Sequence, residues 1–155
     1  MDLILDILSN KTLIAASLSW LAAQLIKTSI DLVLYKSFNP ERLVGSGGMP
    51  SSHSSTVCAL CTMALMEYGA ASFQFSVTFI LAMVVMYDAA GVRRETGKQA
   101  KVLNAMLRDN PFEWKDEVLD QKLKELVGHT PLQVTAGAIL GIIIAILLRT
   151  TVYSV

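Results

Sequence analysis

Four long apolar segments constrain the fold of this chain more strongly than any other feature. They run from about 12 to 35, 51 to 68, 73 to 90 and 131 to 152. A helix needs roughly 20 apolar residues to cross the hydrocarbon core of a bilayer. Of the 155 residues, 53% are hydrophobic and 17% are charged. Because the apolar residues are grouped into these runs, the sequence predicts an all-α integral membrane bundle with about four transmembrane helices.

The remaining residues add shorter helices outside the bilayer. In the polar region 93–128, apolar residues recur at helical spacing on both sides of Asn110-Pro111, which predicts two amphipathic helices. The N-terminal residues, Met-Asp-Leu-Ile-Leu-Asp at 1–6, form a short, acidic, amphipathic segment. We expect them to lie along the membrane interface, with Asn10 capping the next helix. Together these parts predict a single membrane domain over residues 1–155.

The distribution of charge predicts the orientation of the bundle. Four spans place both termini on one side of the membrane and the two long connections on the other. Most of the Lys and Arg residues fall in those connections, whereas Lys11 and Arg149 lie near the opposite face. Because cytoplasmic loops carry an excess of Lys and Arg, we expect the connections to be cytoplasmic. The formal net charge is zero, so nothing indicates a nucleic-acid partner.

The chain has two histidines, His53 and His129, and each precedes or begins an apolar segment on the predicted cytoplasmic side. Histidine is the side chain that exchanges a proton near neutral pH without a large pKa shift. One interpretation is a pair of histidines that cap membrane helices. The other is a reactive site at the membrane surface.

Two further features, Lys27 and the residues just before His53, are candidates for binding an anion. Lys27 lies well inside the first apolar segment, where a charge costs a few kcal/mol and should face a partner or a polar cavity. A structural pair with Asp31 is the alternative. Gly48 permits backbone conformations that expose amide groups, and Ser51 and Ser52 add hydroxyls at the start of a helix. This combination favours phosphate binding.

A third group of candidates follows the third apolar segment. Arg93 and Arg94 are either ordinary anchors at the membrane surface or the guanidinium groups that grip a phosphate. Asp88 is placed to orient one of these cations or a histidine. Cys58 and Cys61 lie inside an apolar run, which indicates small buried residues of a membrane helix rather than a metal or redox pair.

These motifs resemble a known family. Pro-Ser-Ser-His at 50–53 is similar to the Pro-Ser-Gly-His signature of the type 2 phosphatidic acid phosphatase superfamily, which includes vanadium-dependent haloperoxidases and membrane lipid phosphatases. His-Thr-Pro-Leu-Gln-Val-Thr-Ala-Gly at 129–137 resembles its His-x-Pro-x-Asp-Val-x-x-Gly element. The fuller stretch at 47–54, followed by Asp88 and Gly-Val-Arg-Arg at 91–94, is similar to the small divergent branch of that superfamily.

The resemblance implies catalysis through a phosphohistidine. His129 would attack phosphorus, and His53 would protonate the leaving oxygen and then activate water. Gln133 stands where the family has the aspartate that orients the nucleophilic histidine. Since Lys and Arg supply the positive charge, neither a metal nor a cofactor is expected. The residues implied to hold the phosphate are Lys27, Gly48, Ser51, Ser52, Arg93 and Arg94.

Two functions remain open from the sequence. The first is hydrolysis of a phosphate monoester or pyrophosphate, carried by a membrane lipid, by a metal-independent phosphatase. The second is a membrane protein that binds phosphate or phospholipid headgroups for transport or as a scaffold. Two arginines of the superfamily fall at positions 34 and 123, which are leucine here. These absences and Gln133 favour the second. The pattern Gly137-x-x-x-Gly141 in the last segment also offers a close-packing face for a homodimer.

Overall fold

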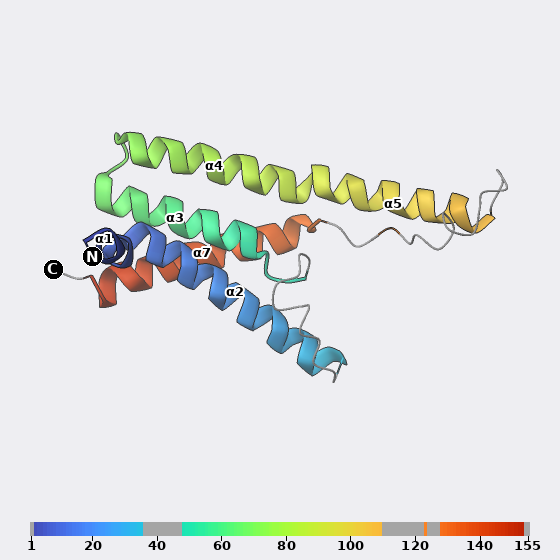
Figure 1. Ribbon diagram of the computed structural model, residues 1–155, viewed down its shortest axis with the longest axis horizontal. Coiled ribbons are helices and arrows are strands. Elements are labelled where there is room, and N and C mark those ends of the chain that lie inside the picture. The colour runs from blue at the N-terminus through green and yellow to red at the C-terminus, as the bar shows by residue number, and fades with distance from the viewer. Residues whose placement is uncertain (1, 36–47, 110–122, 124–127, 154–155) are drawn as a thin grey trace.

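The computed structural model describes residues 2–35, 48–109, 123 and 128–153, and within these residues the fold is all-α, as predicted (Figure 1). The helices that cover the four apolar segments begin and end within one residue of the predicted positions. The elements are α1 (Asp2–Ser9), α2 (Lys11–Tyr35), α3 (Ser52–Tyr68), α4 (Phe73–Ala90), α5 (Val92–Asp109) and α7 (Pro131–Thr151).

Three helical stretches in the described residues are long and apolar enough to cross a membrane. They are Lys11–Leu34, Phe73–Leu107 and Pro131–Thr151. The prediction of four spans is therefore met only in part. The remaining helix, α3, has 17 residues, which is about 26 Å at 1.5 Å per residue. That is somewhat shorter than the roughly 30 Å of hydrocarbon in a bilayer.

Helix α3 is the centre of the bundle. It packs against α7, α2 and α4, and its small residues let these neighbours approach closely. A Cβ atom on Gly137 would overlap the carbonyl oxygen of Ser51, and one on Gly141 would overlap that of Ser55. The glycine face expected to serve a homodimer is thus buried within the chain against α3. Spacing alone does not say which helix a small-residue face will meet, and a homodimer stays a prediction.

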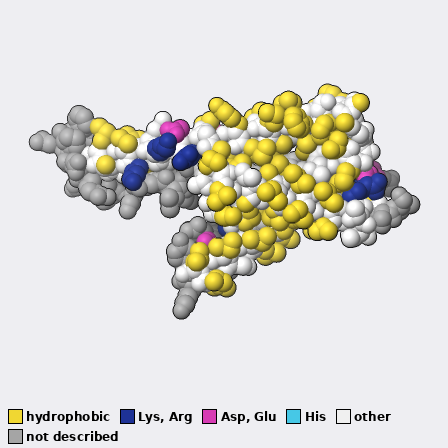
Figure 2. Space-filling view, turned by 180° about the vertical axis from the view of Figure 1, so that it is seen from behind, with side chains coloured by type: hydrophobic (Ala, Val, Ile, Leu, Met, Phe, Trp, Pro, Cys, Tyr) yellow, Lys and Arg dark blue, Asp and Glu magenta, His cyan; other side chains and the backbone are white. Residues whose placement is uncertain are grey.

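The interior of the bundle changes character along its length. Near the start of α3, Ser19 and Ser55 lie with their Oγ atoms 2.5 Å apart, and the Ser19 hydroxyl also approaches the Ser55 carbonyl at 3.0 Å. Farther along is an apolar cluster of small side chains around Met63. Large hydrophobic side chains lie on the outside instead (Figure 2). A polar interior within an apolar exterior is typical of helices surrounded by lipid.

Helix α5 continues almost in line with α4 after Gly91 and extends beyond the rest of the bundle (Figure 1). It is the first predicted amphipathic helix. The Asn104 side chain forms two hydrogen bonds with the backbone of Leu123, at 2.8 and 3.0 Å. The second predicted amphipathic helix falls on residues outside the described part of the chain.

The two ends of the bundle differ. Both termini lie at one end, and the starts of α3 and α7 lie at the other (Figure 1). As predicted, the side chain of Asn10 caps α2, because its Oδ1 accepts a hydrogen bond from the Leu13 amide at 3.1 Å. The site residues on α3 and α7 are therefore gathered at the end opposite the termini.

Candidate functional site

The two histidines, 76 positions apart in sequence, face each other. Their ring centroids are 6.2 Å apart and the ring planes meet at 62°. His53 is in the first turn of α3 and is half-buried, whereas His129 lies just before α7 and is 3% exposed. The packing of α3 against α7 brings the two rings together.

Backbone hydrogen bonds join the three chain segments around these rings. The Ser51 amide donates to the Gln133 carbonyl at 3.1 Å, which joins the start of α3 to the first turn of α7. The His129 amide donates to the Ala89 carbonyl at 3.0 Å, which joins the same region to the last turn of α4. The distance between the imidazoles is thus fixed by main-chain contacts as well as by side chains.

Gln133 offers a hydrogen-bond acceptor to the His129 ring. Its Oε1 accepts a hydrogen bond from the Thr130 amide at 3.0 Å, and the same atom lies 3.3 Å from His129 Nδ1. An amide N–H always donates, so the atom that it meets is the oxygen of the glutamine side chain. A neutral ring that donates its Nδ1–H to this oxygen has its lone pair on Nε2, which is the tautomer that a nucleophilic histidine requires.

The same residues form the start of α7. Thr130 Oγ1 accepts a hydrogen bond from the Gln133 amide, and the Gln133 side chain returns one from the Thr130 amide, which together form a capping box. Pro131 occupies the first turn, where its missing N–H costs nothing. The capping box was not predicted from the sequence, although Thr-Pro-Leu-Gln at 130–133 matches its pattern.

Burial lowers the pKa of His129, and the nearby positive charge of Lys27 and the His53 ring act in the same direction. The hydrogen bonds with the Gln133 side chain and the Gly48 backbone oppose this change. The net direction is downward, so the ring is held neutral at neutral pH. A neutral imidazole is the nucleophilic form.

Lys27 points into the bundle, as expected from its position in an apolar segment. Its side chain is 1% exposed, and its Nζ donates to Gln24 Oε1 at 2.7 Å. The methylene stem runs beside Gly48, where an added Cβ would lie 3.1 Å from Lys27 Cγ. Gly48 has a φ of +82°, a conformation that favours glycine. Lys27 and the Gly48 backbone therefore stand together next to His129.

The two serines differ in what they contact. The Ser51 hydroxyl caps α3, because it lies 3.4 Å from the Ser54 amide and 3.1 Å from the Ser54 hydroxyl. Ser52 is 4% exposed in the first turn of the same helix. Ser51 therefore has a role in capping α3. The contact with phosphate that was predicted for both serines stays a prediction.

The arginines and Asp88 lie on the α4–α5 side. Asp88 is half-buried in the last turn of α4, next to the residue whose carbonyl binds His129. Arg94 is exposed on α5, and the side chain of Arg93 lies outside the described part of the structure. The described contacts thus unite His53, His129 and Gln133 with Lys27 and Gly48. They do not bring Arg94 into this group.

Metal ligands do not gather in this part of the molecule. Among the residues that the structure describes, no group of three or more His, Cys, Asp or Glu side chains is arranged to hold a metal ion. Cys58 and Cys61 are both buried in α3, and the Cys58 thiol lies 3.7 Å from the Met86 sulfur of α4.

The fold and the site define a helical membrane protein with two facing histidines at one end of its bundle. A sequence model of the Divergent PAP2 family matches residues 8–144, so the chain belongs to that family. It is also 38% identical over 153 residues to a protein of Bacillus subtilis (strain 168) named "Uncharacterized membrane protein YuiD". That match covers 93% of this chain and 97% of the Bacillus protein. No solved structure matches.

Proposed function

We propose that this protein is a metal-independent membrane phosphatase that hydrolyses a phosphate monoester or pyrophosphate of a lipid through a phosphohistidine. The observation that carries the proposal is the pair of facing imidazoles, 6.2 Å between centroids, with Gln133 Oε1 placed 3.3 Å from Nδ1 of His129. Membership of the Divergent PAP2 family supports the same chemistry.

The reaction takes two steps. The His129 Nε2 lone pair attacks phosphorus, the bond from phosphorus to the leaving oxygen breaks, and protonated His53 donates its proton to that oxygen. Neutral His53 then takes a proton from water, and the resulting hydroxide attacks phosphorus. The N–P bond breaks, which releases inorganic phosphate and regenerates neutral His129 and protonated His53.

The facing rings suit the transfer of a terminal phosphoryl group. A nucleophile approaches its target to about 3–3.5 Å before bond formation, and a general acid lies about 2.6–3.2 Å from the atom it protonates. A phosphoryl group held beside rings whose centroids are 6.2 Å apart would therefore have a nucleophile and a proton donor close to it. A monoester and the end of a pyrophosphate both carry such a group.

Lys27 supplies positive charge to the phosphoryl oxygens. Its ammonium is buried and acts electrostatically on His129, and an ammonium is worth more in a site without water than in solution. The Gly48 backbone adjoins the lysine stem and adds amide dipoles. Because these groups are already in place, they can stabilise the negative charge on the phosphoryl oxygens without moving during the reaction.

The placement of the histidines supports a lipid substrate and a cytoplasmic site. The starts of α3 and α7 lie together at the end of the bundle opposite the termini (Figure 1). A lipid phosphate reaches such a position while its acyl chains stay in the hydrocarbon. The excess of Lys and Arg in the connections at this end supports a cytoplasmic orientation.

Purified protein in detergent tests the proposal. Phosphate release is measured from phosphatidate, from an isoprenoid pyrophosphate and from a water-soluble phosphate monoester, with His129→Ala as the blank. Wild type should release phosphate from a lipid substrate and form an acid-labile, base-stable phosphoprotein that His129→Ala does not form. Failure of wild type to exceed the blank on all three substrates would refute catalysis.

The second candidate is a binder of phosphate or phospholipid headgroups, and Gln133 favours it because a neutral amide stabilises an imidazolium less than a carboxylate does. Vanadate or phosphate binding separates the two. Binding that requires Lys27, together with no turnover on any substrate, identifies the protein as a binder.

A further inference from the structure

A second polar recess lies at the end of the bundle opposite the two histidines. It has a volume of about 290 Å³ and forms where α1 meets the start of α2 and the end of α3. This volume is at the lower end of the range for small-molecule sites. Its lining includes Asp6, Asn10, Lys11, Thr12, Glu67 and Tyr68.

The charged residues that line the recess are Lys11 and two acids, Asp6 and Glu67. Glu67 faces two cations, because its Oε2 lies 3.0 Å from Lys11 Nζ and its Oε1 lies 3.0 Å from Nε of Arg149, which lies outside the lining. The cluster of Lys11, Glu67 and Arg149 therefore has an excess of one positive charge. Asp6, exposed near the end of α1, supplies a negative charge. The pair is complementary to a zwitterion with no net charge.

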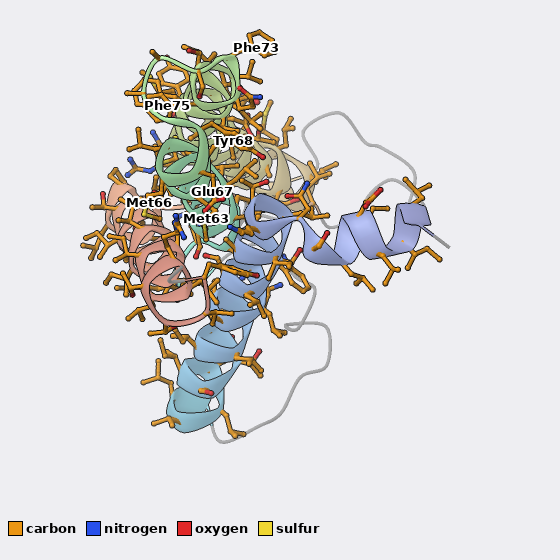
Figure 3. All side chains as sticks on the ribbon, turned by 90° about the vertical axis from the view of Figure 1, so that its left-hand side faces the viewer. Met63, Met66, Glu67, Tyr68, Phe73 and Phe75 are labelled. Atoms are coloured by element: carbon orange, nitrogen blue, oxygen red, sulfur yellow. The ribbon has the colours of Figure 1, made fainter. Side chains whose placement is uncertain are left out.

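Helix α1 indicates that the recess lies at a lipid surface. The helix projects sideways from the bundle near the end of α3 that carries Glu67 and Tyr68 (Figure 3). Its large apolar side chains are 49–72% exposed. A short helix that lies across the start of a candidate span, with exposed aliphatic side chains, is typical of the membrane interface. These side chains are Leu3, Ile4, Leu5, Ile7 and Leu8.

We propose that this recess binds the headgroup of a zwitterionic phospholipid with a primary ammonium, on the membrane face opposite the histidines. The phosphate of the headgroup faces Lys11, with the polar side chains of Asn10 and Thr12 beside it. The ammonium donates hydrogen bonds to Asp6 and lies against the Tyr68 ring, which attracts a cation through its face. The recess accommodates a headgroup but not acyl chains, so the chains lie along the apolar side of α1.

Lipid-dependent stability tests this site. The unfolding temperature of delipidated protein in detergent is measured while phosphatidylethanolamine, phosphatidylcholine or phosphatidylglycerol with matched acyl chains is added. At a lipid concentration about one hundred times its dissociation constant, phosphatidylethanolamine should raise the unfolding temperature by about 5 to about 10 °C. The other two lipids should raise it less, because choline has no N–H donor and phosphatidylglycerol has no cation.

The Asp6→Asn variant identifies the recess as the binding site. It removes a charge from an exposed side chain and leaves the ion pairs of Glu67 intact, so the fold is preserved. Phosphatidylethanolamine should bind it about tenfold more weakly, the loss expected for one hydrogen bond to a charged group. The matched control is Glu95→Gln on α5, another exposed acid-to-amide change, which should bind like wild type.

Each result has a definite meaning. Selectivity for phosphatidylethanolamine that is lost in Asp6→Asn and kept in Glu95→Gln supports the proposal. Equal stabilisation by all three lipids, or selectivity that survives in Asp6→Asn, overturns it. The last measurement uses soluble phosphoethanolamine. If it stabilises the protein as much as the lipid does, the ligand is a diffusible molecule, and the proposal of a lipid ligand is overturned. None of these measurements depends on phosphatase turnover.

Discussion

Replacing Gln133 by Glu should increase phosphatase turnover without disturbing the fold. Glu has the same length as Gln, so its carboxylate oxygen can occupy the position of Oε1, 3.3 Å from His129 Nδ1 and 3.0 Å from the Thr130 amide. Glu also serves as well as Gln at this position of a capping box. The substitution therefore adds one negative charge at the orienting contact and changes little else.

The size of the effect follows from the charge that forms on the ring. Attack by Nε2 leaves a positive charge on the imidazole, and a hydrogen bond to a charged group contributes about 1.5–3 kcal/mol compared with about 1 kcal/mol for a neutral one. A Coulomb estimate for unit charges about 5 Å apart at an effective dielectric constant of about 20 gives about 3 kcal/mol as an upper bound. A gain of about 1.4 kcal/mol corresponds to about tenfold in turnover, and we expect at least that increase.

Phosphate release from the best lipid substrate measures the change. Gln133→Leu removes the acceptor and should lower turnover, whereas Gln74→Glu makes the same chemical change on the exposed start of α4 and should have no effect. The carboxylate should also raise the pKa of His129 and move the acidic limb of the pH profile upward. Unchanged turnover and an unchanged pH profile in a folded Gln133→Glu protein would refute the role assigned to this contact.

Three further predictions concern other parts of the site and the bundle. Lys27→Met should abolish vanadate binding, measured by calorimetry, and should lower the unfolding temperature somewhat because the buried Gln24 Oε1 loses the Lys27 donor; unchanged vanadate binding in a folded variant would make the lysine structural. Because the pKa of His129 is lowered, the acidic limb of the kcat/KM profile should lie below pH 6.5. The free energy of unfolding should also fall as pH drops below about 6.5, because the unfolded state binds the proton at a higher pH than the folded state does. A free energy of unfolding that rises below that pH would contradict the lowering of the His129 pKa by burial. Gly137→Ala should destabilise the bundle by about 1–3 kcal/mol in reversible unfolding, and a neutral effect would mean that α3 and α7 can separate freely.

The sequence predicts the helices well because the apolar runs end at strong local signals. The segment 73–90 is reproduced to the residue, and Ser72 and Gly91 bound it. The central position of α3 was not predictable, since hydropathy reports how apolar a helix is and not which neighbours surround it. For the same reason the glycines of α7 were expected to face a second copy and instead meet Ser51 and Ser55.

The site was predictable where one short stretch of sequence supplies the geometry. The four-residue spacing predicted the contact between Gln133 and His129, but for the wrong reason: His129 lies before α7, and the capping box turns the Gln133 side chain back to within 3.3 Å of Nδ1. The hydrogen bond from the His129 amide to the Ala89 carbonyl could not be predicted from the sequence, because every residue has a backbone carbonyl. The predicted roles of the arginines stay predictions: Arg94 is exposed, and the side chain of Arg93 is not described.

The close contact of α7 with α3 has a consequence for chemistry rather than for stability. Gly137 lies one turn after Gln133, whose carbonyl holds the amide that begins α3, and His53 follows that amide by two residues. Any side chain at position 137 would move the two helix starts apart and widen the gap between the imidazoles. In-line displacement loses rate steeply when the reacting groups move apart by about 1 Å. The distance between the two imidazoles thus depends on the absence of a side chain at Gly137, a residue outside the site itself.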